Sequence, residues 1–215
     1  MIKISLVLQR TLRAAALLAV IAAFCLPATT ARADRLSPTE TAVLAGGCFW
    51  GMEEVFEQLV GVHSVVAGYA GGSERTARYN LVSTGTTGHA ESVRIVFDPR
   101  RISYQTLLRV FFNVAHDPTE LNRQGPDDGT QYRSAIFFAS DEQRKEALAF
   151  INRLATTHAF SAPIVTQVVP LRGFYPAEPY HQHYAQLHPD NPYIIQNDAP
   201  KVAFLRSRFP ALTTH

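Results

Sequence analysis

The sequence lacks internal repeats, low-complexity tracts, a lysine-rich tail and a basic stripe. Its apolar content of 47% and charged content of 18% are close to those of average soluble globular proteins. These features argue against a collagenous, low-complexity or wholly disordered protein, and the formal net charge of +2 gives no evidence for a nucleic-acid partner. After residue 33 no linker is long enough to separate two domains, so we expect residues 34–215 to form a single domain.

The first 33 residues contain four basic residues and no acidic residue. Within them, residues 14–26 form an apolar run of 13 residues that ends at Pro27, whereas a membrane-spanning helix needs roughly 20. Together with the small-x-small sequence Ala31-Arg32-Ala33, this pattern is typical of a secretory signal peptide that is cleaved after residue 33. We therefore expect export, to the periplasm, and no stable membrane anchor. The alternatives are an uncleaved anchor and a lipoprotein signal at Cys25, which the preceding Phe24 disfavours.

The scarcity of cysteine makes one residue conspicuous. The sequence has only Cys25 and Cys48, and removal of the signal peptide leaves Cys48 alone, in a chain with two more acidic than basic residues. The mature chain cannot form an internal disulfide. A lone cysteine in an exported protein is an intermolecular partner, a buried packing residue or a reactive thiol.

Hydrophobic periodicity predicts an α+β domain. We expect strands at residues 41–45, 62–69, 91–97, 134–139 and 164–169. Helices are expected from near residue 48, from a cap at Ser103 to about residue 116, over residues 141–154 with Asp141 at the start, and near residues 178–187. This order favours a two-layer sandwich with a mixed, mostly antiparallel sheet of the split βαβ (ferredoxin-like) type. Residues 72–90 and 119–131 are expected to be loops, and the chain after Gly173 a long irregular tail.

Cys48 lies between a predicted strand and a predicted helix, in the sequence GGCFWG. The free N–H groups and positive dipole end of a helix N-terminus favour the thiolate, which is the reactive form of cysteine. A small buried hydrophobe in a turn is the alternative interpretation. Because Phe49 and Trp50 can form an apolar cup around a reactive sulfur, the reactive thiol is the stronger hypothesis.

Seven short motifs occur in a fixed order along the chain. They are GGCFWG at 46–51, GYAGG at 68–72, GHAE at 88–91, HDPT at 116–119, NRQG at 122–125, GTQYRS at 129–134 and YHQHY at 180–184. Together they resemble the A-type peptide methionine sulfoxide reductases, from about residue 41 to about residue 197. The resemblance implies reduction of methionine S-sulfoxide, free or in proteins, to methionine.

The resemblance also implies roles for individual residues. Cys48 corresponds to the nucleophile that attacks the sulfoxide sulfur and becomes a sulfenic acid, and Glu91 to the carboxylic acid that protonates the departing oxygen. A carboxylate would serve poorly as a proton donor. We therefore expect desolvation to raise the pKa of Glu91.

Five further residues complete the implied site. Tyr79 and Tyr132 correspond to tyrosines that hydrogen-bond the sulfoxide oxygen, and Asp127 to an aspartate of the loop, with Asp128 as the second choice. Phe49 and Trp50 are expected to form the apolar wall for the substrate methyl group. The reaction requires no metal ion and no organic cofactor.

The sequence departs from many relatives in lacking a second cysteine near its C-terminus. Ser83 also stands in the loop where some members of the family have a cysteine. We therefore expect a one-cysteine cycle in which an external thiol reduces the sulfenic acid directly. The partner is a thioredoxin-like protein or a small thiol, and we expect the enzyme to be a monomer.

Two other functions remain open at this point. A cysteine hydrolase or acyltransferase would use His116 or His89 as its base. A non-catalytic exported binding protein would use its aromatic residues as a recognition cup. The tail contains three nearby histidines, His181, His183 and His188. Histidine is the commonest metal ligand, but this spacing alone is weak evidence and we do not predict a metal site.

Overall fold

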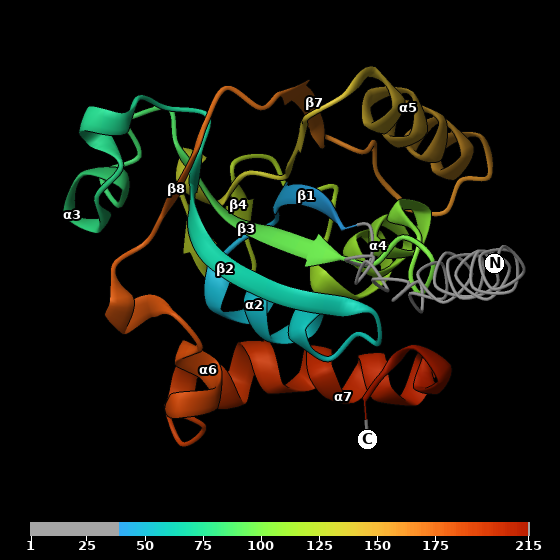
Figure 1. The fold of residues 1–215 in the computed structure, drawn as a ribbon. Helices are drawn as coiled ribbons and strands as arrows, with labels where there is room; N and C mark the ends of the chain where they lie inside the picture. Colours follow the sequence, from blue (N-terminus) through green and yellow to red (C-terminus); the bar gives the residue numbers. More distant parts are fainter. Residues whose placement is uncertain (1–38, 215) are drawn as a thin grey trace, which may run out of the picture. The chain divides into compact units, whose positions relative to one another are not determined.

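A mixed β-sheet organises the chain, of which the computed structural model describes residues 39–214 (Figure 1). The predicted signal peptide lies outside the described residues. The six strands are β1 (Glu40–Ala45), β2 (Val62–Ala70), β3 (Ala90–Phe97), β6 (Ala135–Phe138), β7 (Gln167–Pro170) and β8 (Phe174–Pro176), in the order β7-β6-β1-β3-β2-β8. Only the β6–β7 pair is parallel, and the other pairs are antiparallel.

The helices are α2 (Phe49–Glu57), α3 (Tyr79–Val82), α4 (Tyr104–Val110), α5 (Asp141–Thr156), α6 (Tyr184–Leu187) and α7 (Ala199–Arg208). Two π-helical turns adjoin them, at Phe111–Ala115 after α4 and at Ile194–Asp198 before α7. The strands β4 (Arg123–Gln124) and β5 (Asp127–Asp128) form a small separate hairpin. Among the described residues, no helix has the length and hydrophobicity needed to cross a membrane.

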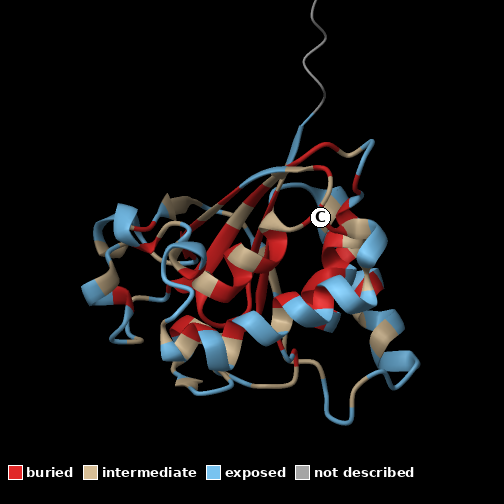
Figure 2. Cartoon of the chain, turned by 90° about the horizontal axis from the view of Figure 1, so that it is seen from below, coloured by how far each residue is buried: buried red, intermediate tan, exposed pale blue. Residues whose placement is uncertain are grey.

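The main hydrophobic core lies on one face of the sheet. Leu44 on β1 and Ile95 on β3 pack there with residues of α2, α4, α5 and α7. Figure 2 colours most of the central strands and parts of the adjoining helices as buried. Alternate residues such as Val43 and Phe137 point to the other face, where they form a smaller cluster. The period of two along each strand therefore separates the two faces.

The structure confirms an α+β fold with a mixed, mostly antiparallel sheet, and it corrects several local predictions. Ser140 caps α5, because its hydroxyl accepts a hydrogen bond from the backbone N–H of Gln143 at 3.2 Å, whereas Asp141 is already helical. The loop at 72–90 contains the short helix α3, and β7 begins at Gln167, three residues later than predicted.

The C-terminal segment is not the irregular tail that was expected. It contributes β8 to the sheet edge and ends in the ten-residue helix α7, which packs against α2. Val202 and Leu205 on α7 are buried in the main core. The helix α7 was not predicted because two buried apolar residues are too few to give a clear helical periodicity. Only the contact with the core shows which face of this helix is apolar.

Candidate active site

Cys48 is the N-cap residue of α2, directly after the turn that follows β1. The residue is 9% exposed, and it is the only cysteine of the described chain. Gly47, immediately before it, has a φ of 96°, and a Cβ atom there would lie 2.6 Å from Cγ of Gln124. Only glycine therefore fits the turn that brings Cys48 to the start of the helix.

The electrostatic surroundings of Cys48 correct the expectation of a thiolate. Burial is the largest effect and raises the pKa of Cys48 well above its ordinary value, and the carboxyl groups of Glu91, Asp198 and Asp127 raise it further. The backbone N–H of Trp50, at the helix N-terminus, acts in the opposite direction. The dipole argument identified a real contribution, but desolvation outweighs it, so the resting thiol keeps its proton.

Glu91 lies close to Cys48, at the start of β3. It is 2% exposed, and its Oε2 accepts a hydrogen bond of 3.1 Å from the backbone N–H of Phe49, the residue next to the thiol. Burial raises the pKa of Glu91 to about 8, although this hydrogen bond opposes the shift. The carboxyl group is consequently un-ionised at neutral pH, as the sequence argument required, and can donate a proton.

Tyr79 and Tyr132 adjoin the part of the core that contains Cys48. Both are half-buried against the core cluster that contains Cys48. Burial raises the pKa of each phenol, with further contributions from Glu91 and Cys48. Because Glu91 and Cys48 both affect the pKa values of these phenols, the two hydroxyl groups lie within electrostatic range of the thiol and the carboxyl group. Both phenols keep their protons at neutral pH and can donate hydrogen bonds.

Phe49 and Trp50 form an aromatic wall together with residues of the C-terminal segment. The ring of Phe49 is buried and packs on His181, with ring centroids 5.0 Å apart. The indole N–H of Trp50 donates to Nδ1 of His181 at 3.1 Å, and its ring stacks on Tyr184 at 3.8 Å. His181, which sequence reasoning considered only as a metal ligand, therefore orients the wall. Its position inside the YHQHY motif was the available signal.

Asp127 lies beside Cys48 in a cavity of about 100 Å³, as the loop motif predicted. Its Oδ2 accepts a hydrogen bond from the hydroxyl group of Tyr193. Burial raises the pKa of Asp127, and this hydrogen bond opposes the shift. Asp128, the second choice, is exposed and does not line the cavity.

Sequence reasoning missed two charged residues in the C-terminal segment. Asp198 is 0% exposed and pairs with Nζ of Lys201 at 3.2 Å, and Lys201 lines the cavity that holds Cys48. A Cβ atom on Gly51 would lie 2.1 Å from Oδ1 of Asp198, so glycine allows the ion pair to approach α2. The spacing of three residues between Asp198 and Lys201 was only a weak indication of a buried ion pair, because acid–base pairs with this spacing are common on exposed helices.

Neither candidate histidine base is available to the thiol. The ring of His116 is buried and bonded to the carbonyl of Phe111 at 2.9 Å and the hydroxyl of Ser134 at 2.7 Å, and burial lowers its pKa to about 4. His89 is bonded through both ring nitrogens, to Gly72 and Ser73. Without a histidine to take the proton of Cys48, the geometry argues against the hydrolase alternative.

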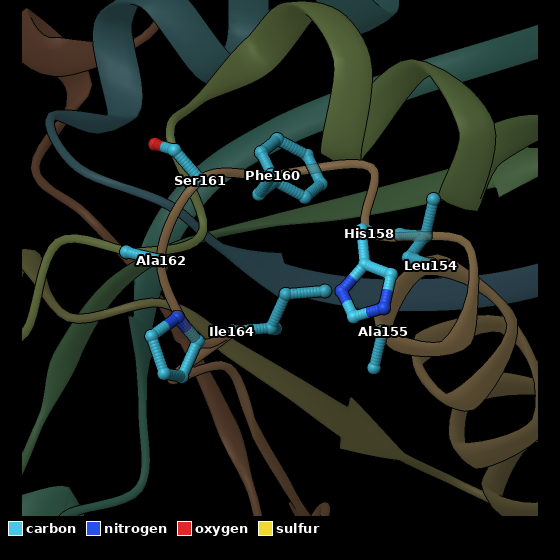
Figure 3. Close-up of a pocket in the computed structure, with 8 residues that line it drawn as sticks. Leu154, Ala155, His158, Phe160, Ser161, Ala162 and Ile164 are labelled. Atoms are coloured by element: carbon cyan, nitrogen blue, oxygen red, sulfur yellow. The ribbon is translucent and has the colours of Figure 1, made fainter.

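A larger cavity lies elsewhere and carries no comparable chemistry. It measures about 250 Å³ and lies at the C-terminal end of α5, where His158, Phe160 and Ile164 surround it (Figure 3). It shares no lining residue with the cavity at Cys48. Size alone therefore does not identify the functional site.

The described residues around Cys48 are a buried thiol, a buried un-ionised carboxyl group and protonated phenols, and neither His89 nor His116 is free to act as a base. The family model described as "Peptide methionine sulfoxide reductase" matches residues 40–212. The chain therefore belongs to the peptide methionine sulfoxide reductase family.

Individual relatives agree with the family match. The chain is 53% identical over 174 residues to peptide methionine sulfoxide reductase MsrA 2 of Mesorhizobium japonicum, which covers 81% of this chain and 89% of the relative. Reduced Mxr1 of Saccharomyces cerevisiae is 35% identical with a TM-score of 0.65, covering 71% of this chain and 87% of that one. Methionine sulfoxide reductase A of Corynebacterium diphtheriae is 36% identical with a TM-score of 0.62, covering 70% and 76%.

The protonation of Glu91 is directly measurable. We expect an infrared component of an un-ionised carboxyl group that disappears as the pH rises through about 8 and that Glu91→Gln lacks, whereas the component of Glu53, whose pKa burial raises to about 7, remains in that variant. In the unfolded chain Glu91 releases its proton near the ordinary pKa of 4.5, whereas the folded state keeps this proton up to about pH 8. The contribution of Glu91 to the free energy of unfolding therefore decreases as the pH rises from about 4.5 to 8.

The exposed Glu142, in the first turn of α5, provides the matched control. Glu142→Gln should leave the band and its titration unchanged. A carboxyl group at position 91 that titrates near pH 4.5 would contradict the assignment of a buried proton donor.

Proposed function

We propose that this protein reduces the S epimer of methionine sulfoxide, free or in proteins, to methionine. The observation that carries the proposal is the pairing of Cys48 with the buried, un-ionised Glu91 through the Phe49 N–H group. Membership of the peptide methionine sulfoxide reductase family supports the same reaction.

In the first step, the sulfur of Cys48 attacks the sulfoxide sulfur while Glu91 gives a proton to the sulfoxide oxygen, and the proton of the Cys48 thiol passes to the Glu91 carboxylate that is left. The oxygen then passes to Cys48, methionine leaves, and Cys48 is oxidised by two electrons to a sulfenic acid. The hydroxyl groups of Tyr79 and Tyr132 hydrogen-bond the oxygen as it gains negative charge. Phe49 and Trp50 hold the methyl group of the substrate.

Asp127 has a supporting role in this scheme. Its hydrogen bond with Tyr193 fixes the wall of the cavity next to Cys48. The carboxyl group then faces the position where the sulfenic acid forms.

The second half of the cycle uses an external thiol. The thiol attacks the sulfenic acid, forms a mixed disulfide with Cys48 and releases water, and a second thiol restores the Cys48 thiol while the two external sulfurs become a disulfide. A thioredoxin-like protein or a small thiol fills this role, because Cys48 is the only cysteine after residue 33. The electrons come from thiols, so the cycle needs no metal ion and no organic cofactor, and a monomer suffices.

The four central strands support a more specific description of the fold. Their order β6-β1-β3-β2, with antiparallel neighbours, is the arrangement of a split βαβ (ferredoxin-like) core. A crystal structure with another order of these strands would contradict this description.

The assay of the proposed reaction compares the two epimers of a dabsylated methionine sulfoxide with dithiothreitol as the reductant. We expect turnover of the S epimer only, no turnover in Cys48→Ser, and a decrease of about 10²- to 10⁴-fold in Glu91→Gln, since a general acid contributes about that much. Asp128 is exposed and provides the control, so Asp128→Asn should retain activity. Asp127→Asn should lose part of the activity. Activity on the R epimer alone, or in Cys48→Ser, would rule out the proposed reaction.

The one-cysteine cycle predicts the product of a single turnover. After treatment with the substrate and no reductant, mass spectrometry should find one added oxygen on Cys48. A thiol added afterwards should return the original mass. Release of less than one methionine per chain together with an unmodified Cys48 would contradict the cycle.

We also propose that the protein is exported and acts in the periplasm. The proposal is supported by the basic, acid-free leader with its cleavage sequence at Ala31–Ala33, and by the family match, which begins downstream at residue 40. In a Gram-negative host, the periplasmic fraction should contain a chain that starts at Asp34, and Ala33→Asp should block this processing. An intact chain that stays in the cytosol would refute export.

A further inference from the structure

Three potential metal ligands meet on the face of α2 that does not line the cavity at Cys48. Glu53 and Glu57 are one helical turn apart on α2, and His183 is the N-cap residue of α6. One ligand atom from each residue lies within 4.8 Å of the other two. The tail supplies the imidazole group, so folding brings the three together from positions 130 residues apart.

Hydrogen bonds already hold these side chains in place. Oε1 of Glu57 lies 2.7 Å from Nδ1 of His183, and Oε2 of Glu57 accepts from Nε2 of Gln186 at 2.6 Å. The backbone N–H of His183 donates to Oε2 of Glu53 at 2.7 Å. Outer hydrogen bonds that fix the ligands in this way are a regular feature of metal sites.

Glu53 provides an independent indication of a ligand. The residue is 1% exposed, and its Oε1 atom is buried without a hydrogen-bond partner among the described residues. A buried oxygen of this kind is costly unless a donor or a cation satisfies it. Within residues 39–214, neither Glu53 nor Glu57 has a lysine or arginine nitrogen within 4.0 Å. Among these residues, His183 and Gln186 supply the hydrogen bonds that the two carboxyl groups accept, and no lysine or arginine balances them.

The surface next to this cluster has room for solvent ligands. A cavity of about 390 Å³ is lined by Glu57 and His183, together with His63 and Ser64 of β2. An ion can enter from this side and keep water in its coordination sphere. Such a site has the form of three protein ligands with one open position.

We propose that Glu53, Glu57 and His183 bind a divalent zinc-type cation. One imidazole and two carboxylates suit zinc, because this borderline ion accepts nitrogen and oxygen ligands together. The ion displaces the contact between His183 and Glu57, supplies the missing partner of Glu53 and neutralises the paired carboxylates.

Binding at this site has a structural consequence for the catalytic wall. The segment that carries His183 also carries His181 and Tyr184, which orient Trp50. The cation would fasten this segment to α2 at a point between these two contacts. It acts as a positioning device and takes no part in the redox reaction.

Isothermal titration of the metal-free full-length chain with zinc chloride tests the proposal. We expect one zinc ion per chain, and a Kd raised by about 10- to 100-fold in His183→Gln and in Glu57→Gln, on the scale known for damaged metal sites. His188→Gln is the matched control, because His188 is exposed on the same segment and outside the cluster. It should bind zinc as the wild type does.

Two further measurements separate this site from zinc bound by the thiol. Cys48→Ser should bind zinc with unchanged affinity. X-ray absorption of the zinc-loaded wild type should show nitrogen and oxygen ligands at about 2.0–2.1 Å and no sulfur at about 2.3 Å. Glu57 and His183 are not fully buried, so their variants test the site even if Glu53→Gln fails to fold.

Three results would overturn the proposal. They are an absence of zinc binding to the wild type, equal affinity in wild type and His183→Gln, and a sulfur ligand in the absorption spectrum. In the first two cases the contact between His183 and Glu57 is only a surface hydrogen bond.

Discussion

The hydrogen bond from the backbone N–H of Phe49 to Glu91 determines the relative position of the two central groups of the site. This N–H belongs to the first turn of α2, where backbone donors have no partner within the helix. The acceptor, Glu91, is the second residue of β3. This strand pairs with β1 on one side and β2 on the other. Because both elements are held rigidly by the sheet and the core beneath it, the thiol and the acid cannot separate without disturbing the fold.

The same burial that makes Glu91 an acid also makes Cys48 a poor nucleophile at rest. Desolvation disfavours both charged forms, so the resting site contains a thiol and a carboxylic acid. A protonated thiol reacts slowly with oxidants and other electrophiles. In the reaction proposed above, Cys48 is therefore protected until a sulfoxide, whose oxygen accepts the available protons, enters the site.

The sequence was sufficient to predict the elements that carry a strong local pattern. The alternation of Val93, Ile95 and Phe97 predicted β3, and the glycine-flanked Cys48 predicted the turn into α2. It also indicated Glu91, which lies in the GHAE motif, and Asp127, which the family resemblance assigns in the loop between two motifs. The thiolate prediction failed because local dipole reasoning does not include the acids and the low-dielectric core that the fold places around Cys48.

The contributions of the C-terminal segment could not be predicted for a related reason. Asp198, Lys201 and His181 reach the site through residues far earlier in the chain, such as Gly51 beside Asp198 and Trp50 beside His181. No local periodicity or composition records such contacts, and the four-residue helix α6 is too short to give a clear pattern.

The late position of these residues sets the time at which the site becomes complete during synthesis. Position 48 leaves the ribosome long before Asp198 and Lys201, so the nascent thiol emerges before the residues that complete its cavity. A chain that stops before residue 198 would lack both members of this ion pair. The last part of the chain therefore completes the surroundings of a sulfur that was synthesised near its beginning.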